Sequence, residues 1–436
     1  MKKILCLLIT LLFCITVTTQ TFAQKNTTDL TVTEKIIVNT IDYNKTTIFD
    51  ISKQIWNFKE PGNKEIKSSA LLEDSLEKQG FSVQRGVTGI DPTNGDKVPM
   101  NTAFIATYKG LEGGLTIGIM VEYDALPNGH ACGHNLLSEA GYAAAIGLKE
   151  VLKTTHGTVI VYGCPAEETT GSKQYMLKAG LMDKVDTMLC VHGGDNWSSE
   201  VSVKAMVWPK YQLDGLVFTG KASHASLAPE KGRSALDAAI LMGTGIEFLR
   251  EHIAETDRIH YVFLDGGKAA NVVPDYAKVD LMVRANDSSE LMALTKRVDN
   301  IIKGAALMTD TTAKYEWDAP LLAATLDPEL YHFVANTASS VGISEDKFVF
   351  GTPPGPSTDA GNVAYEIPTA QVLFPITEVN QPPAHTDEFR DAAIKDYALN
   401  NSMIAGKIMA LTGYRILTNP EELKKIKADF AKNHKK

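Results

Sequence analysis

The chain has 436 residues, 44% of them hydrophobic and 22% charged, and a formal net charge of −9. This length exceeds one ordinary hydrophobic core, so two domains are expected in a soluble globular protein. The acidic balance excludes a general electrostatic attraction to nucleic acid or to anionic lipid.

The N-terminal segment 1–23 has the pattern of a cleavable secretory signal peptide. Lysines at positions 2 and 3 precede an apolar run over residues 4–17, and the small residue Ala23 stands just before Gln24. The apolar run is shorter than the roughly 20 residues that a membrane anchor requires. We therefore expect an exported protein, periplasmic or secreted, with no membrane attachment after cleavage.

Cleavage of this segment would leave three cysteines, Cys132, Cys164 and Cys190. Three cysteines in a large exported chain do not form a disulfide framework. Cys164 and Cys190 lie in apolar stretches, and we interpret both as packing residues. Cys132 lies instead in "GHACGHN", for which a metal site, a cysteine nucleophile and a buried turn are competing interpretations.

The first half of the mature chain predicts an α/β sheet. Residues 30–80 carry apolar side chains at three- and four-residue spacing, which indicates helices. Three short apolar runs follow, typical of strands covered on both faces: 115–121, 157–163 and 186–191. Helices are expected between these runs, at 135–154 with Asn135 as N-cap and at 171–181. Such alternation is typical of a doubly wound, mainly parallel sheet.

A second pattern occupies residues 203–317, where the expected order is strand, helix, strand, strand, helix, strand. This βαββαβ order predicts a small two-layer domain of ferredoxin-like type. The α/β character resumes afterwards, with a strand at 367–374 and a closing helix at 397–417. The smaller domain is therefore expected to be inserted into the larger one, which comprises residues 24–202 and 318–436.

Residues of the types that commonly bind metals follow four strands of the expected larger sheet. The strand ends supply these residues: Cys132 and His134, Glu167 and Glu168, His192, and His385. Open α/β sheets place their sites at the carboxyl ends of the strands. We therefore expect these residues to converge at one edge of the sheet.

A metal site explains this set best, because thiolate, imidazole and carboxylate together suit zinc, manganese or cobalt. Consecutive side chains diverge, so one glutamate is expected to bind metal and the other to act as general base. One ion and two ions are both feasible. The competing interpretation makes Cys132 a nucleophile with His134 or His130 as its base. That interpretation leaves the glutamates and His385 without a role.

These residues lie in motifs that resemble a known family, the co-catalytic metal amidohydrolases of the aminoacylase and carboxypeptidase type. Within it the chain is similar to the branch of auxin-conjugate amidohydrolases, aminobenzoyl-glutamate hydrolase and Xaa-basic dipeptidases. The matching stretches are "EYDALPNGHACGHN", "PAEETTGSK", "VHGG", "GKASHAS", "GGKAANVVPD", "STDAGNVAYEIPTAQ" and "PAHTDEF". They follow the family order and span essentially the whole mature chain.

The resemblance implies a role for each matching residue. The implied metal ligands are Cys132, His134, Glu168, His192 and His385, with Glu167 as general base. Asp124 would orient the site, and His224 would reach the partner subunit's active site from the inserted domain. Asn271 and, as a weaker match, Arg284 would contact the substrate. The inserted domain would then be a lid that carries dimerisation, which implies a homodimer.

The expected function is that of an exported, metal-dependent amidohydrolase or dipeptidase. Its substrate would be a small N-acyl or N-aminoacyl amino acid or a dipeptide, cleaved at the amide or peptide bond by water that one or two divalent ions activate. A family member that has lost catalysis and only binds small ligands is the alternative, against which the intact Glu167 argues. Asn135 stands where the auxin-conjugate branch has Asp, and this departure leaves the substrate open.

Overall fold

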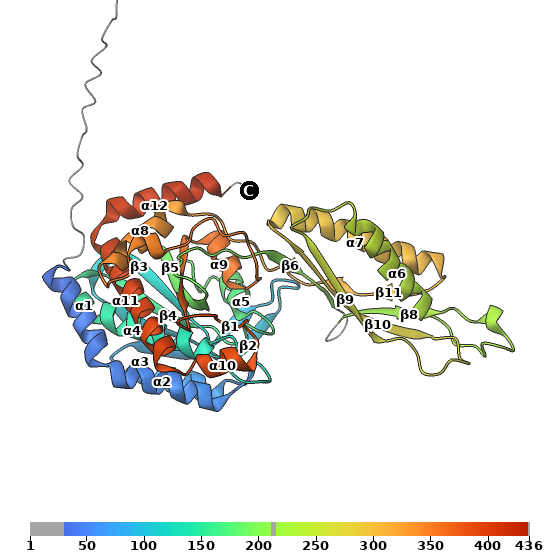
Figure 1. Ribbon diagram of the computed structural model, residues 1–436, viewed down its shortest axis with the longest axis horizontal. Coiled ribbons are helices and arrows are strands. Elements are labelled where there is room, and N and C mark those ends of the chain that lie inside the picture. Colours follow the sequence, from blue (N-terminus) through green and yellow to red (C-terminus); the bar gives the residue numbers. More distant parts are fainter. Residues whose placement is uncertain (1–29, 211–214, 435–436) are drawn as a thin grey trace, which may run out of the picture.

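The computed structural model describes residues 30–210 and 215–434, so the predicted signal peptide lies outside the described residues. The chain forms a larger α/β part and a smaller, elongated part beside it, which Figure 1 shows at the left and the right. Strand β6 (Ala205–Val207) lies where the chain passes from one to the other. Across the described ranges, no helix has the length and apolar character to cross a membrane.

A six-stranded sheet forms the centre of the larger part. Its order is β1 (Ser82–Ile90), β2 (Lys97–Lys109), β4 (His156–Gly163), β3 (Leu111–Val121), β5 (Thr187–Gly194) and β13 (Thr369–Pro375). The last four strands run parallel, whereas β1 and β2 form an antiparallel hairpin at one edge. The carboxyl ends of the four parallel strands therefore meet at one edge of the sheet.

Helices cover both faces of this sheet, as the doubly wound prediction requires. The helices of this part are α1 (Val32–Tyr43), α2 (Lys45–Phe58), α3 (Ile66–Lys78), α4 (His134–Leu152), α5 (Ser172–Lys178), α8 (Pro328–Ser339), η2 (Glu345–Lys347), α9 (Ala360–Glu366), α10 (Asp387–Ala392), α11 (Asp396–Thr418) and α12 (Pro420–Asn433). Helices α4 and α11 pack on each other and on the parallel strands, while α5 and α9 pack together. Gly141 lets α4 pack closely on β3, because a Cβ atom there would lie 2.1 Å from the Val121 side chain.

The smaller part is an antiparallel sheet with two helices. In chain order it contains β6, β7 (Pro209–Lys210), β8 (Leu216–Thr219), η1 (Pro229–Lys231), α6 (Ala235–Arg250), β9 (Arg258–Asp265), β10 (Tyr276–Ala285), α7 (Ser288–Met308), β11 (Thr312–Lys314) and β12 (Glu316–Trp317). Strand β10 pairs with β8 on one side and with β9 on the other, since Val279 has a partner in each. Helices α6 and α7 pack against β10 and each other.

This part has its own core, separate from that of the larger part. Its buried apolar residues run from Ala205 to Ala306, with Ala323 in addition. The βαββαβ order and the separate core confirm the predicted fold class, a doubly wound α/β domain with a ferredoxin-like insertion. The boundaries at residues 203 and 317 stay a prediction.

Local details differ from the expectations. The N-cap of α4 is Gly133, not Asn135, and the Asn135 amide is buried, donating to Ser52 Oγ and to the carbonyl of Ala393. The hairpin β1–β2 was not predicted. The last expected strand of the insertion is split, because β11 joins the antiparallel sheet whereas β12 pairs with β7. Helix α11 is followed by α12, so it does not close the chain.

Candidate metal centre

The loop after β3 brings Cys132 and His134 to the same place. Gly133, between them, has φ 79°, a left-handed conformation that favours glycine. A Cβ atom at this position would lie 3.3 Å from the ring of Phe389. His134 begins helix α4, so its backbone is held by the helix while Cys132 stays in the loop.

The loop after β4 determines the positions of Glu167 and Glu168. Ala166 has φ 59°, which is strained for a residue with a side chain. Its N–H donates to the buried Glu65 carboxylate at 2.7 Å, and its carbonyl accepts from the N–H of Gly171 at 2.9 Å. The N–H of Glu168 donates to Asp124 Oδ2 at 3.0 Å, which ties this loop to the one after β3.

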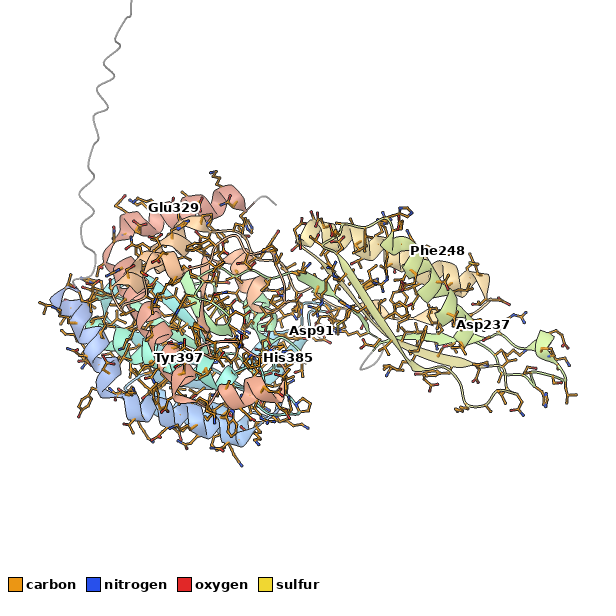
Figure 2. All side chains as sticks on the ribbon, viewed as in Figure 1. Asp91, Asp237, Phe248, Glu329, His385 and Tyr397 are labelled. Carbon is orange, nitrogen blue, oxygen red and sulfur yellow. The ribbon has the colours of Figure 1, made fainter. Side chains whose placement is uncertain are left out.

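The remaining two histidines come from β5 and from the segment after β13. His192 lies within β5 rather than after its end, and its Nε2 is 3.5 Å from Cys132 Sγ. His385 has φ 71°, and its N–H donates to the carbonyl of Ala131 at 2.8 Å. Its Nε2 is 3.5 Å from Glu168 Oε1. Figure 2 labels His385 on the larger part of the molecule.

These side chains form overlapping groups with metal-ligand spacing. Cys132, His134 and His192 place one ligand atom each within 4.8 Å of one another, and so do Cys132, Glu168 and His385. The two triads share the Cys132 sulfur. A third group of the same spacing contains Glu122, His134 and Glu167. The arrangement is that of two adjacent candidate sites with the Cys132 sulfur in common.

The hydrogen bonds around the cluster test whether it fits a metal. His134 Nδ1 lies 2.9 Å from Asp124 Oδ1 and 3.0 Å from the Asp124 carbonyl, and both oxygens accept, so Nδ1 carries the proton. Nε2 is then available as a ligand atom. Nε2 and Glu168 Oε1 are both buried and make no hydrogen bond, although Nε2 lies 3.3 Å from Glu122 Oε2 and Glu168 Oε1 lies 3.5 Å from His385 Nε2. A histidine tautomer fixed by its neighbours, together with buried nitrogen and oxygen atoms that make no hydrogen bond, is typical of a set of metal ligands. The residues therefore fit one or two divalent ions.

Burial changes the acidity of the cluster. Desolvation raises the pKa of the Cys132 thiol to about 12, whereas an activated cysteine nucleophile has a lowered pKa. Desolvation, and then the negative charge of Glu122, raise the pKa of Glu167 to about 8. For Asp124 burial alone would raise the pKa, but the His134 charge and hydrogen bond lower it, so Asp124 is an anion beside that imidazole.

A buried ion network that was not predicted from the sequence lies beside the cluster. Lys173 Nζ is 2.7 Å from Glu122 Oε1 and 2.5 Å from Asp359 Oδ1. The backbone N–H of Lys173 also donates to Asp359 Oδ2, at 2.8 Å. All three side chains are buried. Burial alone would raise the pKa of Glu122, but Lys173 and then His134 lower it, so Glu122 stays ionised. The only sequence signal was that all three residues lie in the quoted motifs.

The structure separates the other predicted site residues from this cluster. His224 and Asn271 are neighbours in the inserted part, where the N–H of Ala225 donates to the Asn271 carbonyl. His224 lies in the loop between β8 and α6, and Asn271 lies in the loop between β9 and β10. Figure 1 shows both loops in the smaller part, on the side away from the larger part. Arg284 lies in β10, and its Nη1 donates to Ser357 Oγ at 3.1 Å.

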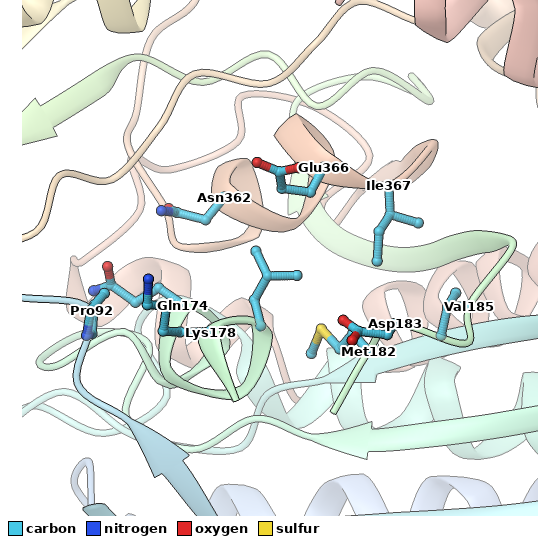
Figure 3. Close-up of a pocket in the computed structure, with 10 residues that line it drawn as sticks. Pro92, Gln174, Lys178, Met182, Asp183, Val185, Asn362, Glu366 and Ile367 are labelled. Carbon is cyan, nitrogen blue, oxygen red and sulfur yellow. The ribbon is translucent and has the colours of Figure 1, made fainter. Parts of the chain in front are cut away.

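A cavity of about 560 Å³ between α5 and α9 is distinct from the metal cluster. Figure 3 shows Gln174 and Asn362 on opposite walls, with Met182 and Ile367 further along. None of its lining residues is a predicted site residue.

Comparisons with known proteins agree with this geometry. A family model described as "Peptidase family M20/M25/M40" matches residues 118–399. The chain is 32% identical to a p-aminobenzoyl-glutamate hydrolase chain of Escherichia coli (strain K12), over 87% of this chain and 90% of that protein. It is also 32% identical to the Xaa-Arg dipeptidase of Mus musculus, over 72% and 73% respectively.

Solved structures show the same fold at lower identity. An aminobenzoyl-glutamate utilization protein from Klebsiella pneumoniae matches with a TM-score of 0.64 at 19% identity, over 85% of this chain and 96% of that one. The YXEP protein of Bacillus subtilis, a dinuclear metal binding M20 peptidase, matches with a TM-score of 0.61 at 18% identity, over 86% and 99%. The chain belongs to peptidase family M20/M25/M40 and is a metal-dependent hydrolase of amide or peptide bonds.

Proposed function

We propose that the chain hydrolyses the amide or peptide bond of a small N-acyl or N-aminoacyl amino acid or of a dipeptide. The observation that carries the proposal is the pair of ligand triads that share Cys132. The names of the relatives support this range, since they include p-aminobenzoyl-glutamate hydrolase, Xaa-Arg dipeptidase and indole-3-acetyl-aspartic acid hydrolase.

Five residues would hold two divalent ions. Cys132, His134 and His192 would hold one ion, and Cys132, Glu168 and His385 would hold the other, so the Cys132 sulfur belongs to both groups. Zinc, manganese and cobalt all suit this mixture of sulfur, nitrogen and oxygen donors. Bound ions would supply Lewis acidity toward the carbonyl and a more acidic water.

Glu167 is the proposed general base. Its Oε2 lies 3.9 Å from His134 Nε2, so the carboxylate borders the ligand cluster. In the proposed mechanism Glu167 takes a proton from the attacking water and then gives it to the leaving amine. Asp124 fixes the tautomer and orientation of His134 through the 2.9 Å hydrogen bond.

His224 is proposed to act in the partner subunit's site. Its Nδ1 accepts from the N–H groups of Ser226 and Leu227 at 3.2 Å, which leaves Nε2–H as an exposed donor for a carbonyl oxygen. Asn271 lies beside it and would contact the same substrate. His224 does not cap the following helix, because the side chain of Ser234 caps α6.

A homodimer is proposed on the basis of exposed apolar side chains in the inserted part. Strand β9 pairs only with β10 among the described residues, so its other edge is unpaired. Val262 and Leu264 on β9 are exposed, as are Ile240 and Phe248 on α6. An unpaired strand edge next to exposed apolar residues favours association with a second copy.

Arg284 is proposed to bind a substrate carboxylate, because its charged group lies near the junction of the two parts with no ion pair among the described residues.

Export to the periplasm or the medium is proposed from residues 1–23 alone.

The experiment is hydrolysis of a panel of N-acetyl amino acids and dipeptides by the purified protein. A chelator should abolish activity, and added manganese or zinc should restore it. Mass spectrometry during turnover should detect no acyl adduct. An adduct on Cys132, or activity that survives complete chelation, would overturn the metal mechanism.

A further inference from the structure

His134 Nε2 belongs to two of the three groups with metal-ligand spacing. One group joins it to Cys132 and His192, and the other joins it to Glu122 and Glu167. Glu122 Oε2 lies 3.3 Å from this nitrogen and Glu167 Oε2 lies 3.9 Å from it. An imidazole nitrogen has a single lone pair, so it binds only one ion at a time. An ion held by the two glutamates would therefore remove His134 from the cluster that shares Cys132.

The group of Glu122, His134 and Glu167 has the properties of a competing metal site. Two carboxylates and an imidazole suit zinc and manganese. Glu122 Oε2 is buried and makes no hydrogen bond, so it is a free ligand atom close to His134 Nε2. An ion bound here would also occupy the carboxylate of Glu167, which the proposed mechanism needs for proton transfer. Metal at this group would thus block catalysis through two residues.

A buried lysine lies directly beside this group. Lys173 Nζ is 2.7 Å from Glu122 Oε1, and the lysine side chain has no exposed surface. Asp359 holds both the side chain and the backbone of Lys173, because Oδ1 pairs with Nζ at 2.5 Å and Oδ2 accepts from the backbone N–H at 2.8 Å. Burial alone would lower the pKa of Lys173, but Asp359 and then Glu122 raise it, so the ammonium stays charged. A fixed positive charge therefore borders the competing group.

This charge opposes a metal ion at the Glu122 group. Coulomb repulsion between an ammonium and a divalent ion is several times stronger in a protein interior than in water. The charge of Lys173 acts on Glu167 as well, because it lowers the pKa that burial and Glu122 raise. At the group of Cys132, Glu168 and His385 the situation differs. Within residues 30–210 and 215–434, no lysine or arginine forms an ion pair with Glu168.

We propose that Lys173 is a built-in cation that keeps metal ions out of the group formed by Glu122, His134 and Glu167. The inference rests on the proposed function, in which His134 is a metal ligand and Glu167 is the general base. Lys173 would act through Glu122 and not on the substrate, so it is a positioning residue. It leaves His134 for the ion that Cys132 binds, and it leaves Glu167 free to accept a proton.

The test counts the sulfur neighbours of zinc by X-ray absorption, on protein that is loaded with zinc and then desalted. Zinc–sulfur bonds of about 2.3 Å are resolved from the shorter bonds to nitrogen and oxygen, of about 2.0–2.2 Å. Each ion in the wild-type protein should have one sulfur neighbour, whether one ion binds or two, because both ligand groups contain Cys132. In Lys173→Met, zinc held by Glu122, His134 and Glu167 has none, so the average per zinc should fall to about one half or below.

Control variants separate this role from a structural one, in which Lys173 only joins the segments around Glu122 and Asp359. Lys173→Arg keeps the charge and should keep one sulfur per zinc. Lys173→Met combined with Glu122→Gln removes the competing carboxylate and should restore that value. Lys178→Met, the same change at an exposed position of α5, should have no effect. A structural role predicts a less stable protein with an unchanged number of sulfur neighbours.

Unfolding midpoints establish which variants are folded. If Lys173→Met does not fold, Lys173→Met with Asp359→Asn carries the same expectation, because one of the two buried carboxylates is then neutral. One sulfur per zinc in the folded variant would overturn the role of Lys173 alone, and so would a decrease that Glu122→Gln does not reverse. Zinc without a sulfur neighbour in the wild-type protein would refute both this role and the ligand assignment of the proposed function. Sulfur-bound zinc that is lost in Lys173→Met, in a protein that hydrolyses no member of the substrate panel, would refute the proposed function and leave the role of Lys173 standing.

Discussion

At the scale of single residues, Glu167 and Glu168 show how two adjacent carboxylates acquire different surroundings. Glu168 Oε1 lies 3.5 Å from His385, whereas Glu167 Oε2 lies 3.9 Å from His134 and close to Glu122. Consecutive side chains diverge, and the left-handed Ala166 before them sets the direction of both. The two residues can therefore be separated experimentally by one matched substitution.

We predict that Glu167→Gln keeps its metal and loses activity. The amide has the shape of the carboxylate but cannot accept the proton of water, so kcat should fall by roughly 10²- to 10⁴-fold, the usual contribution of a general base. Elemental analysis and kcat are measured on the same sample. Activity within about tenfold of wild type would remove Glu167 from the role of base.

The matched control is Glu168→Gln, the same change one residue later. Because its carboxylate belongs to the ligand triad with Cys132 and His385, this variant should lose metal as well as activity. If both variants kept their metal equally, the division of tasks between the two glutamates would be wrong.

The convergence of the cysteine, histidine and glutamate residues was predicted from their positions after the strands. Parallel strands have their carboxyl ends at the same edge of the sheet, and this holds for any conformation of the loops. The same reasoning did not identify Glu122, Lys173 and Asp359. A lysine at the start of a short helix has no sequence pattern that separates a buried ion pair from a solvated side chain. Its burial depends on the approach of the segment around Asp359, which lies 186 residues away along the chain.

At the scale of helices and strands, hydrophobic pattern was a good guide wherever it was continuous. The parallel strands β3, β4 and β5 were predicted, and the apolar run in each of them is buried or half-buried on both faces. Hairpin β1–β2 was not predicted, because its strands are half exposed and a register shift between Arg85 and Val87 breaks their alternation. The predicted N-cap of α4 was wrong. Asn135 is a residue type that often caps helices, but the loop turns into the helix through a left-handed backbone conformation at Gly133.

Helix α8 supports a prediction about pH. Its N-cap Asp327 accepts from the N–H of Leu330 at 3.2 Å, but Oδ2 is buried without a partner. Burial, and then the charge of Asp429, raise the pKa of Asp327 to about 7, against about 4 in the unfolded chain. The stability contributed by the neutral carboxyl is thus present below about pH 4 and lost as pH rises to about 7.

In Asp327→Asn the amide oxygen should still accept the capping hydrogen bond from Leu330, and the loss of folding stability with rising pH should disappear. Between pH 4 and pH 8 the free energy of unfolding of the variant, relative to wild type, should rise by up to about 4 kcal/mol. Denaturant unfolding of the metal-free proteins at several pH values measures the difference. A constant difference across this range would show that Asp327 is ionised in the folded protein.

The same substitution at the N-cap of α7 is a control of opposite sign. Burial alone would raise the pKa of Asp287, but hydrogen bonds from Glu290 and Ser289 lower it. The stability that this carboxylate contributes is present above about pH 4 and lost as pH falls further. Asp287→Asn should therefore destabilise the protein at neutral pH and have little effect in acid, the reverse of Asp327→Asn.

At the scale of the whole molecule, one chain holds the proposed catalytic residues in two separate places. The ligands and Glu167 lie at the sheet edge of the larger part, whereas His224 lies in the loop between β8 and α6 of the inserted part. Figure 1 shows that loop on the side away from the larger part. The sequence placed His224 in the inserted domain, and the resemblance implied that it serves the partner subunit. The pattern of residues alone could not give the distance to the ligands, because that distance depends on how the inserted part is oriented on the larger part. A second chain that presents its own His224 would complete each site.

This arrangement predicts that catalysis needs two subunits. His224→Ala and Glu167→Gln should each be inactive alone, but a mixed dimer has one site that combines an intact Glu167 with an intact His224 from the other chain. Co-expression with two affinity tags, followed by isolation of doubly tagged dimers, should therefore recover activity, up to about half that of wild type for one repaired site in two. If His224 served its own subunit, every site in the mixed dimer would keep one defect. Purified mixed dimers without recovered activity would exclude a shared active site.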